Sequence, residues 1–592
     1  MPESRVGYSW WASLVVLSAY AGSGCTGTFE GPMGPAECGR QVCTADPPSG
    51  AVDSEADPFG GDDGNTPRGV GDPASPDGVG WSTRFPKLSN RQWENSVTDL
   101  LRLSQPSGLS EQLVAEPKDV AYASMAASLT VGGDGWARYQ TAAETLAERA
   151  VTDEALFSAI VPASLPSGSD RARAFIAYWG RRAYRRPLTN VELSSYEQLF
   201  QQGPSLVGGD AFRAGVRLVL EATLQSPHFL YRVESTPGGG SQKTWLSGYE
   251  MAVRLSYALW NTTPSDALLD AAEGGELDSE AGVRAWAERM LEDPRAEQTL
   301  LSFHEQTFGV ANYGQQDKSP ELGFAAAELA PVLREEAVRF IREVVIEGEG
   351  GISDLLTAPL AYVNEDTAPF YGLANITGQS LKRVELDPRE RAGLLTQLGF
   401  LATQASLSGS DPVHRGLTVL RKVLCDEPSP PPMMFSLPVV GAGRTTREVY
   451  EEATVCGGSC HQTLINPPGF AFENFDGVGR FRTTEVGLPV DATAEIAIRQ
   501  GYTESQKAAG TTQLLAVNGA ADMLNQLADV PRVHECYARN WLSFALAREV
   551  DPVEQGAFEK LAKTSQDAGS VRQLLIDLVA LDTFRSRIGE PE

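Results

Sequence analysis

The stretch "LSNRQWENSVTDLLRL", residues 88–103, carries the pattern that the rest of the chain repeats. Ser89 is followed three residues later by Gln92, which is the spacing of a capping box at a helix N-terminus. Trp93, Val97 and the leucines after them recur every three or four residues, so they lie on one face of a helix. We therefore predict an amphipathic helix that begins after Ser89 and packs against a core.

The same start signal opens three further stretches: Thr189 with Glu192, Ser247 with Glu250, and Asp387 with Pro388 and Glu390. Proline suits the first turn of a helix, because an N–H group there would have no partner within the helix. The alternation of apolar and polar residues that marks a half-buried strand is sparse, apart from short runs near 480–500. We expect a mostly α fold, with several packed helical domains in tandem.

Clusters of glycine and proline mark the boundaries between these domains. The clearest are "TPGGGSQ" (236–242) and the proline-rich connector 425–443, and a softer break lies near 500–515. A chain of 592 residues is too long for one hydrophobic core, which also favours several domains. The predicted order after a signal peptide at 1–25 is an acidic, Gly- and Pro-rich tether at 26–80, helical domains at 81–165, 166–236 and 243–380, a domain with a Cys–His motif at 386–500, and a C-terminal helical domain at 512–592.

The first 25 residues have the pattern of an export signal. Arg5 precedes the apolar run "WWASLVVLSAYA" (10–21), which is short for a membrane span and has the length of a signal-peptide core. The small residues before Cys25 favour a bacterial lipoprotein signal in which Cys25 is lipidated, and ordinary secretory cleavage is the alternative. We expect a protein of the cell envelope, and Thr26 directly after the lipidated cysteine favours the outer membrane.

The formal net charge of −28 argues against broad binding to nucleic acids or to anionic membranes, because their phosphate groups would be repelled. We therefore expect no nucleic-acid partner, and contact with a membrane only through the lipid anchor. This charge carries no information about the fold.

Export decides how the remaining cysteines are interpreted, because thiols outside the cytosol oxidise and pair. Cys38 and Cys43 lie close together in the tether, and Cys425 and Cys536 are far apart in sequence but available to each other. Spacing alone does not fix which of these cysteines pair.

The stretch "CGGSCHQTLINPPGFAFENFDGVGR" (456–480) is the strongest candidate for a functional site. Covalent haem needs two thiols, which form thioethers with the vinyl groups, and an imidazole that binds the iron. Cys456, Cys460 and His461 supply these groups, although three residues separate the cysteines where two are usual. The Gly-Gly-Ser spacer tolerates the additional residue, so we predict haem c on both cysteines with His461 as the proximal ligand.

Apolar residues after the histidine suit the edge of a haem: Leu464, Ile465, Phe470, Phe472 and Phe475. The alternative is a disulfide between Cys456 and Cys460, with His461 at the surface and the phenylalanines in the core. The spacing of the cysteines alone favours the disulfide slightly, and the adjacent histidine favours haem.

A sixth iron ligand has several candidates. His414 in "DPVHRG", Met523 in "AADMLNQLADV" and Met433 with its neighbour Met434 in the proline-rich connector are the residues of suitable type. An open, five-coordinate iron is a further alternative, so the sequence does not distinguish an electron carrier from an oxidase.

Other polar clusters have structural interpretations. We expect the four arginines of "RRAYRRPL" (181–188) to form ion pairs with neighbouring domains, and His228 and His304 to be satisfied core histidines. Asp476 is either a turn cap or an acid that supports the haem ligand.

Several phrases in a fixed order match a known family: "LSNRQWENSVTDLL" (88–101), "GRRAYRRPLTNVEL" (180–193), "VLEATLQSPHFLYRVE" (219–234), "LSGYEMAVRLSYALWNTTP" (246–264), "DPVHRGLTVLRKVLCDEPSPPP" (411–432), "CHQTLINPPGFAFENFDGVGRFR" (460–482) and "CYARNWLSFALAREVD" (536–551). On these residues the chain resembles the large secreted proteins of planctomycetes and myxobacteria, which are built from tandem planctomycete-type domains of unknown function. The resemblance covers 81–592 and implies an exported, helical, multidomain protein with a cytochrome-c-like module at 386–500.

Two hypotheses follow for function. The first is an envelope lipoprotein like a c-type cytochrome, which passes electrons to a redox partner protein that the sequence does not identify. The second is a disulfide-stapled surface lipoprotein, without enzymatic activity, that binds protein or polysaccharide.

Overall fold

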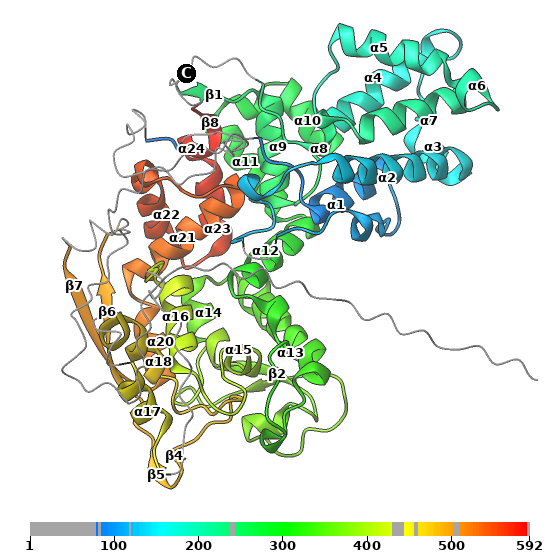
Figure 1. The fold of residues 1–592 in the computed structure, drawn as a ribbon. Helices are drawn as coiled ribbons and strands as arrows, with labels where there is room; N and C mark the ends of the chain where they lie inside the picture. The colour runs from blue at the N-terminus through cyan, green and yellow to red at the C-terminus, as the bar shows by residue number, and fades with distance from the viewer. Residues whose placement is uncertain are drawn as a thin grey trace, which may run out of the picture. The chain divides into compact units, whose positions relative to one another are not determined.

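The structure is a computed structural model that describes residues 78–80, 85–117, 120–235, 243–428, 443–454, 460–501 and 510–588. All of them lie in one of the two units into which the chain divides, Arg40–Glu592. The described residues are mostly helical, and their strands form only two-stranded sheets (Figure 1). The predicted mostly α fold class is therefore confirmed.

Residues 85–235 form one helical body, whose buried core also includes Val253 and Tyr257. Its α-helices are α1 (Asn90–Leu101), α2 (Gly133–Thr152), α3 (Glu154–Ile160), α4 (Asp170–Tyr184), α5 (Asn190–Gln201), α6 (Gly203–Leu206), α7 (Ala211–Leu224) and α8 (Pro227–Leu230), with short 3₁₀ turns η1 (Leu109–Gln112) and η2 (Ala126–Ser128). The capping boxes of Ser89 and Thr189 are formed as predicted. Trp93 of α1 and Trp179 of α4 belong to the same buried cluster, so the segments 81–165 and 166–236 share a core.

Residues 243–588 form a second, larger body. Its α-helices are α9 (Gly248–Leu259), α10 (Asp266–Glu273), α11 (Glu280–Leu291), α12 (Pro294–Thr307), α13 (Ala326–Ile341), α14 (Ile352–Thr357), α15 (Leu398–Thr403), α16 (Pro412–Thr418), α17 (Thr446–Ala453), α18 (Asn466–Phe470), α20 (Ala520–Leu527), α21 (Pro531–Leu546), α22 (Gln555–Ala568), α23 (Val571–Val579) and α24 (Asp582–Arg585). The capping box predicted at Ser247 opens α9.

Shorter elements connect these helices. The 3₁₀ turns are η3 (Glu276–Asp278), η4 (Val310–Asn312), η5 (Pro320–Leu322), η7 (Ala368–Tyr371), η8 (Leu394–Thr396) and η12 (Pro552–Glu554), and the π-helical turns are η6 (Arg342–Glu347), η9 (Val419–Val423) and η11 (Cys460–Ile465). The antiparallel strand pairs are β1 (Thr244–Trp245) with β8 (Ser586–Arg587), β2 (Leu360–Val363) with β3 (Lys382–Glu385), β4 (Thr484–Glu485) with β5 (Leu488–Pro489), and β6 (Thr493–Arg499) with β7 (Thr512–Asn518).

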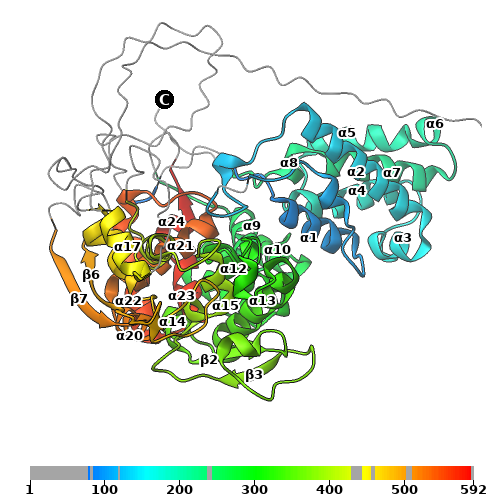
Figure 2. The ribbon, with the colours of Figure 1, turned by 60° about the horizontal axis from the view of Figure 1, so that its bottom comes forward.

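One hydrophobic core runs through the whole second body. Phe303 of α12 stacks on Trp541 of α21, with ring centroids 3.6 Å apart, although the two residues are far apart in sequence. The C-terminal helices α21 and α23 lie beside the green helices α9 and α11 in Figures 1 and 2. The segments 243–380, 386–500 and 512–588 therefore share one core, and the predicted break near 500–515 falls inside the β6–β7 hairpin.

The helix predicted to start at Asp387 and Pro388 is wrong. In the structure residues 388–390 form a turn, and α15 begins only at Leu398. Gly393 has a φ of 58°, a left-handed value that an α-helix excludes, and buried Arg391 donates to the carbonyl oxygens of Thr396 and Gly479. These tertiary contacts override the local start signal.

The two bodies meet through apolar packing of Tyr122 on Phe303 and Phe544, and through ion pairs. Two of the four arginines of 181–188 form the ion pairs predicted for them. Arg181 contacts Asp270 and Glu273 of α10, and Arg182 contacts Asp266 of the same helix. Arg185 is instead buried within the first body, where it donates to the carbonyl oxygens at residues 228, 229 and 231. No helix in the described ranges combines the length and apolarity that a bilayer span requires.

We predict that calorimetry of the full chain shows one cooperative unfolding transition for the two bodies, because Tyr122 of the first body packs on Phe303 of the second. Phe303→Ala should destabilise this transition by about 3–5 kcal/mol, since it removes a fully buried aromatic ring. Phe175→Ala, which removes a buried ring from the core of the first body, should shift the same transition. Two separate transitions, each shifted by only one of the variants, would contradict the shared packing.

Candidate functional site

The predicted haem-binding stretch begins at η11 and runs directly into α18. Cys460, its first described residue, is disulfide-bonded. Cys456 lies outside the described residues, as do the other predicted site residues Met433, Cys25, Cys38 and Cys43. The sulfur of Cys460 is thus bonded to sulfur, whereas a haem thioether would require it to be bonded to carbon.

His461 is half-buried and held by its own local network. Its Nδ1 lies 3.3 Å from Oδ1 of Asn466, and the amide of Asn466 donates to Oγ1 of Thr454 at 2.8 Å. Since the Asn466 oxygen can only accept, Nδ1 carries the proton. Burial lowers the pKa of His461, so the ring is neutral at pH 7. A neutral imidazole whose Nδ1 donates to a carbonyl is the arrangement usual for metal-binding histidines.

The apolar residues proposed to face a haem are packed into the protein core instead. All five are buried: Leu464, Ile465, Phe470, Phe472 and Phe475. Phe472 contacts Phe400 of α15, and Phe475 meets the edge of Phe481, with ring centroids 6.0 and 5.7 Å apart. With Cys460 oxidised and these rings engaged by other side chains, the residues as arranged do not fit a haem.

Helix α16 crosses η11 and α18 with backbone against backbone. A Cβ atom on Gly416 would overlap the carbonyl oxygen of Ile465, and one on Gly469 would overlap that of Pro412. Only glycine permits this approach at either position. The crossing fixes the position of the residues that follow Cys460.

Among the candidate sixth ligands, the structure describes His414 and Met523, and each of them is engaged elsewhere. Pro412 and Gly416 face α18, so His414, half a turn away, projects from the opposite side of α16. His414 instead donates from Nδ1 to Asp411 at 2.7 Å, and this hydrogen bond raises its pKa. Met523 is completely buried in α20, which packs against α14 and β7.

Arg415 is completely buried behind the same crossing. Its guanidinium donates to the carbonyl oxygens of Leu401 (3.1 Å), Phe472 (3.3 Å), Phe475 (2.9 Å) and Asp476 (2.7 Å). Burial lowers its pKa to about 10, which leaves the group charged at neutral pH. One arginine therefore ties α15 and α16 to the segment after α18.

Glu473 is a second buried ionisable group, next to Arg415. Its Oε2 accepts from Ser410 at 3.1 Å and from Arg482 at 3.0 Å, and its Oε1 has no partner. Arg482 also pairs with Glu485 at the start of the β4–β5 hairpin. Burial raises the pKa of Glu473 to about 7.

Asp476 is a turn cap, one of the two roles considered from the sequence. Its Oδ1 accepts from the backbone N–H groups of Val478 and Arg480, each at 2.9 Å.

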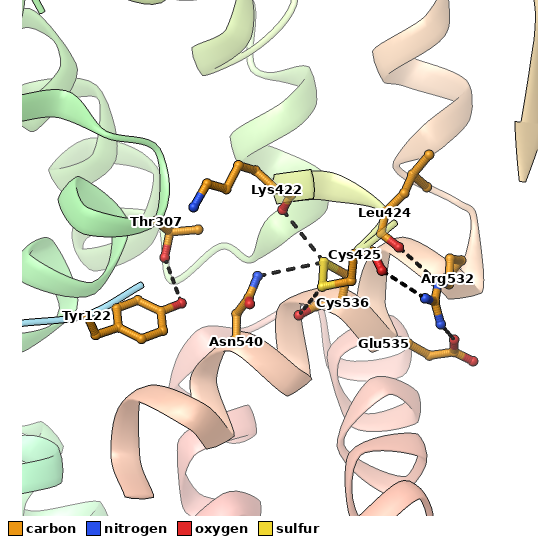
Figure 3. The surroundings of a disulfide bond; sticks show 9 residues. All are labelled: Tyr122, Thr307, Lys422, Leu424, Cys425, Arg532, Glu535, Cys536 and Asn540. Atoms are coloured by element: carbon orange, nitrogen blue, oxygen red, sulfur yellow. Dashed lines mark hydrogen bonds and ion pairs between the residues drawn. A yellow bond between two sulfur atoms is a disulfide. The ribbon is translucent and has the colours of Figure 1, made fainter. Parts of the chain in front are cut away.

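A disulfide between Cys425 and Cys536 lies at the end of this region (Figure 3). It joins Cys425, two residues after the end of η9, to α21, across a sequence separation of 111, with Cα atoms 5.2 Å apart. Cys425 has a left-handed φ of 47°, and buried Arg532 supports this turn by donating to the carbonyl oxygens of Leu424 and Cys425. The disulfide thus clamps one end of the proline-rich connector to the C-terminal helices.

The remaining histidines have structural roles. His304 is a satisfied core histidine, as predicted: it bonds the carbonyl of Leu300 and the hydroxyl of Tyr537, both at 2.7 Å. His534 bonds Ser565 and the carbonyl of Ala528. The core position predicted for His228 is wrong, because its side chain is 44% exposed beside Tyr184. Throughout the described segments, no group of three or more His, Cys, Asp and Glu side chains is placed to hold a metal ion.

Four buried polar residues that organise this region were not predicted from the sequence: Arg415, Asn466, Glu473 and Arg482. They lie in the largely apolar stretches "DPVHRGL" and "INPPGFAFENFDGVGRFR", where a polar side chain needs hydrogen-bond partners in the core, and this position was the signal available.

Five family models match the chain in tandem, each described as a protein of unknown function: DUF1587 over 87–152, DUF1595 over 171–234, DUF1592 over 246–373, DUF1588 over 391–485 and DUF1585 over 515–584. The DUF1588 model, with the short name PSCyt3, covers α16, Cys460 and Arg482. The expected tandem of domains of unknown function is thereby confirmed. Neither a curated protein nor a solved structure matches the chain.

We predict that Gly416→Ala destabilises the 243–588 body by about 1–3 kcal/mol, because the new methyl group overlaps the Ile465 carbonyl. Gly556→Ala in α22, where a Cβ meets nothing within 4 Å, is the control and should cost no stability. Urea unfolding followed by circular dichroism measures both. Equal stability of the two variants would contradict the backbone contact at the crossing.

We also predict that Glu473 makes stability fall as pH rises from about 4.5 to about 7. In that range the Glu473 carboxyl group ionises in the unfolded chain but stays protonated in the folded protein, so rising pH favours unfolding. The Gln side chain of the Glu473→Gln variant does not ionise. The free energy of unfolding of this variant, minus that of wild type, should therefore rise by roughly 3 kcal/mol between pH 4.5 and pH 7. Urea midpoints against pH for both proteins test this, and parallel curves would exclude a raised pKa.

Proposed function

We propose that this chain is an exported, disulfide-braced helical scaffold of the bacterial cell envelope, which presents its folded bodies for binding protein or polysaccharide. The observation that carries the proposal is the oxidised state of its cysteines: Cys425 is bonded to Cys536 in the larger body, and Cys460 is in a disulfide where haem attachment would need a thiol. Disulfides of this kind form and persist in secreted and periplasmic proteins.

The N-terminal sequence supports the same location. In this proposal Cys25 is lipidated and anchors the chain, as an outer-membrane lipoprotein, and the acidic tether 26–80 holds the folded part away from the bilayer. The net charge of −28 favours partners other than nucleic acids or anionic lipids.

A second candidate is a c-type cytochrome with haem c on Cys456 and Cys460. The observation in its favour is the hydrogen bond that holds Nδ1 of His461 on Asn466, because such a bond orients an imidazole for an iron ligand. When bound, haem would supply one-electron transfer to a redox partner protein. This candidate requires that the Cys460 disulfide be opened before haem is attached.

Expression of the full chain in a periplasm that contains cytochrome c maturation enzymes separates the two candidates. The scaffold proposal predicts a colourless protein without a Soret band, both for wild type and for the Cys460→Ser control. A wild-type protein that keeps haem after denaturation, when Cys460→Ser does not, would overturn the scaffold proposal and establish the cytochrome.

A further inference from the structure

A polar cluster unrelated to the cysteines is buried where the DUF1592 and DUF1588 segments meet. Glu336 of α13 is completely buried, and its Oε1 accepts a hydrogen bond from the hydroxyl of Tyr371 in η7. The Tyr371 hydroxyl also accepts from the backbone N–H of Leu398, at the start of α15, at 3.2 Å. This pair therefore connects α13 to the segment after residue 391.

Several polar atoms around this pair have no hydrogen-bond partner. They are Oε2 of Glu336, the hydroxyl of Tyr313, and both Oε1 and Nε2 of Gln397, and all three residues are 1% exposed or less. A polar group buried without a partner is costly, so native proteins rarely leave one. The protein alone leaves these four buried polar atoms, one of them on the Glu336 carboxyl group, without partners, and this is the setting in which proteins bind internal water.

The elements that carry these atoms converge on one place. Helix α13 packs against α15, η4 and η8, and α15 also packs against η4. Tyr313, which follows η4, lies so close to Gly399 that a Cβ on that glycine would overlap the tyrosine ring. Gln397 and Tyr313 therefore both lie next to the first turn of α15. The backbone N–H of Leu398, which donates to Tyr371, belongs to the same turn.

The charges of the surroundings restrict which molecule can bind there. Arg391 lies 4.5 Å from the centre of the Tyr371 ring and carries a positive charge, which disfavours a cation next to the single carboxyl group of Glu336. Arg391 already donates to the carbonyl oxygens of Thr396 and Gly479, which disfavours its use as the partner of an anion. Water is neutral, both donates and accepts, and commonly binds two to four otherwise unsatisfied buried groups.

We propose that Glu336, Tyr313 and Gln397 form an internal hydration site, in which ordered water completes the hydrogen-bond network that joins the DUF1592 segment to the DUF1588 segment. The site goes beyond the proposed scaffold function and is independent of the haem question.

The protonation state of Glu336 agrees with this site. Burial raises the pKa of Glu336 to about 8, so at pH 7 it is mainly the neutral acid. The titratable and charged groups that face it are Tyr371 from η7, Tyr313 next to η4, and Arg391 from the turn before η8. Because Tyr371 donates to Oε1, the acid proton on Oε2 is available to a water molecule.

A double-mutant cycle on the full chain tests whether Tyr313 and Gln397 bind the same water molecule. Tyr313→Phe and Gln397→Met should each lower the urea unfolding midpoint, and the double variant should lose clearly less than the sum, because both residues depend on the same water. The control pairs Gln397→Met with Tyr362→Phe, which breaks a similar tyrosine–glutamate contact on η6 outside the site. The decreases in the urea unfolding midpoint caused by the two control substitutions should be additive.

A crystal structure of the wild-type chain that resolves water gives a second test, which does not depend on the variants folding. We expect water within hydrogen-bond distance of Glu336 Oε2 and Tyr313 Oη. A dry site in which these side chains bond each other directly, or additive losses in the Tyr313–Gln397 cycle, would overturn the proposal.

Discussion

The buried guanidinium of Arg415 is the contact on which the candidate site depends. It remains charged in the core because four backbone carbonyl oxygens accept hydrogen bonds from it. One of those carbonyl groups belongs to residue 401 and the others to residues 472–476. Helix α16, which carries Arg415, comes close to these carbonyl groups because Gly416 and Gly469 have no side chain. The backbones of α16 and α18 can therefore make direct contact at their crossing. The position of the Cys460–His461 turn follows from these two conditions.

The larger body is a single structural unit although three family segments contribute to it. Phe303 packs on Trp541, β1 pairs with β8, and Cys425 is bonded to Cys536, so the beginning, middle and end of residues 243–588 are joined by different kinds of contact. A body joined by these contacts is consistent with the binding role that we propose. Opening the Cys460 turn for a cofactor would require changes in a region where Phe472 and Phe475 are already completely buried.

Signals between residues that are close in sequence were sufficient to predict where several helices begin. Capping boxes at Ser89, Thr189 and Ser247 involve residues three apart, so the sequence alone located those helix starts. The signal at Asp387 failed because a tertiary contact, that of Arg391 with Gly479, determines the backbone there. The roles of Arg415 and Glu473 were equally invisible, since their partners come from residues that only folding brings together.

Peptide mapping by mass spectrometry determines whether Cys460 is in a disulfide. The full chain would be exported to a periplasm, blocked with a thiol reagent and digested without reduction. We expect one cross-linked pair that contains Cys425 and Cys536, and Cys460 in a peptide that is also disulfide-linked. Recovery of Cys460 as a blocked free thiol, or as a thioether to haem, would contradict this expectation.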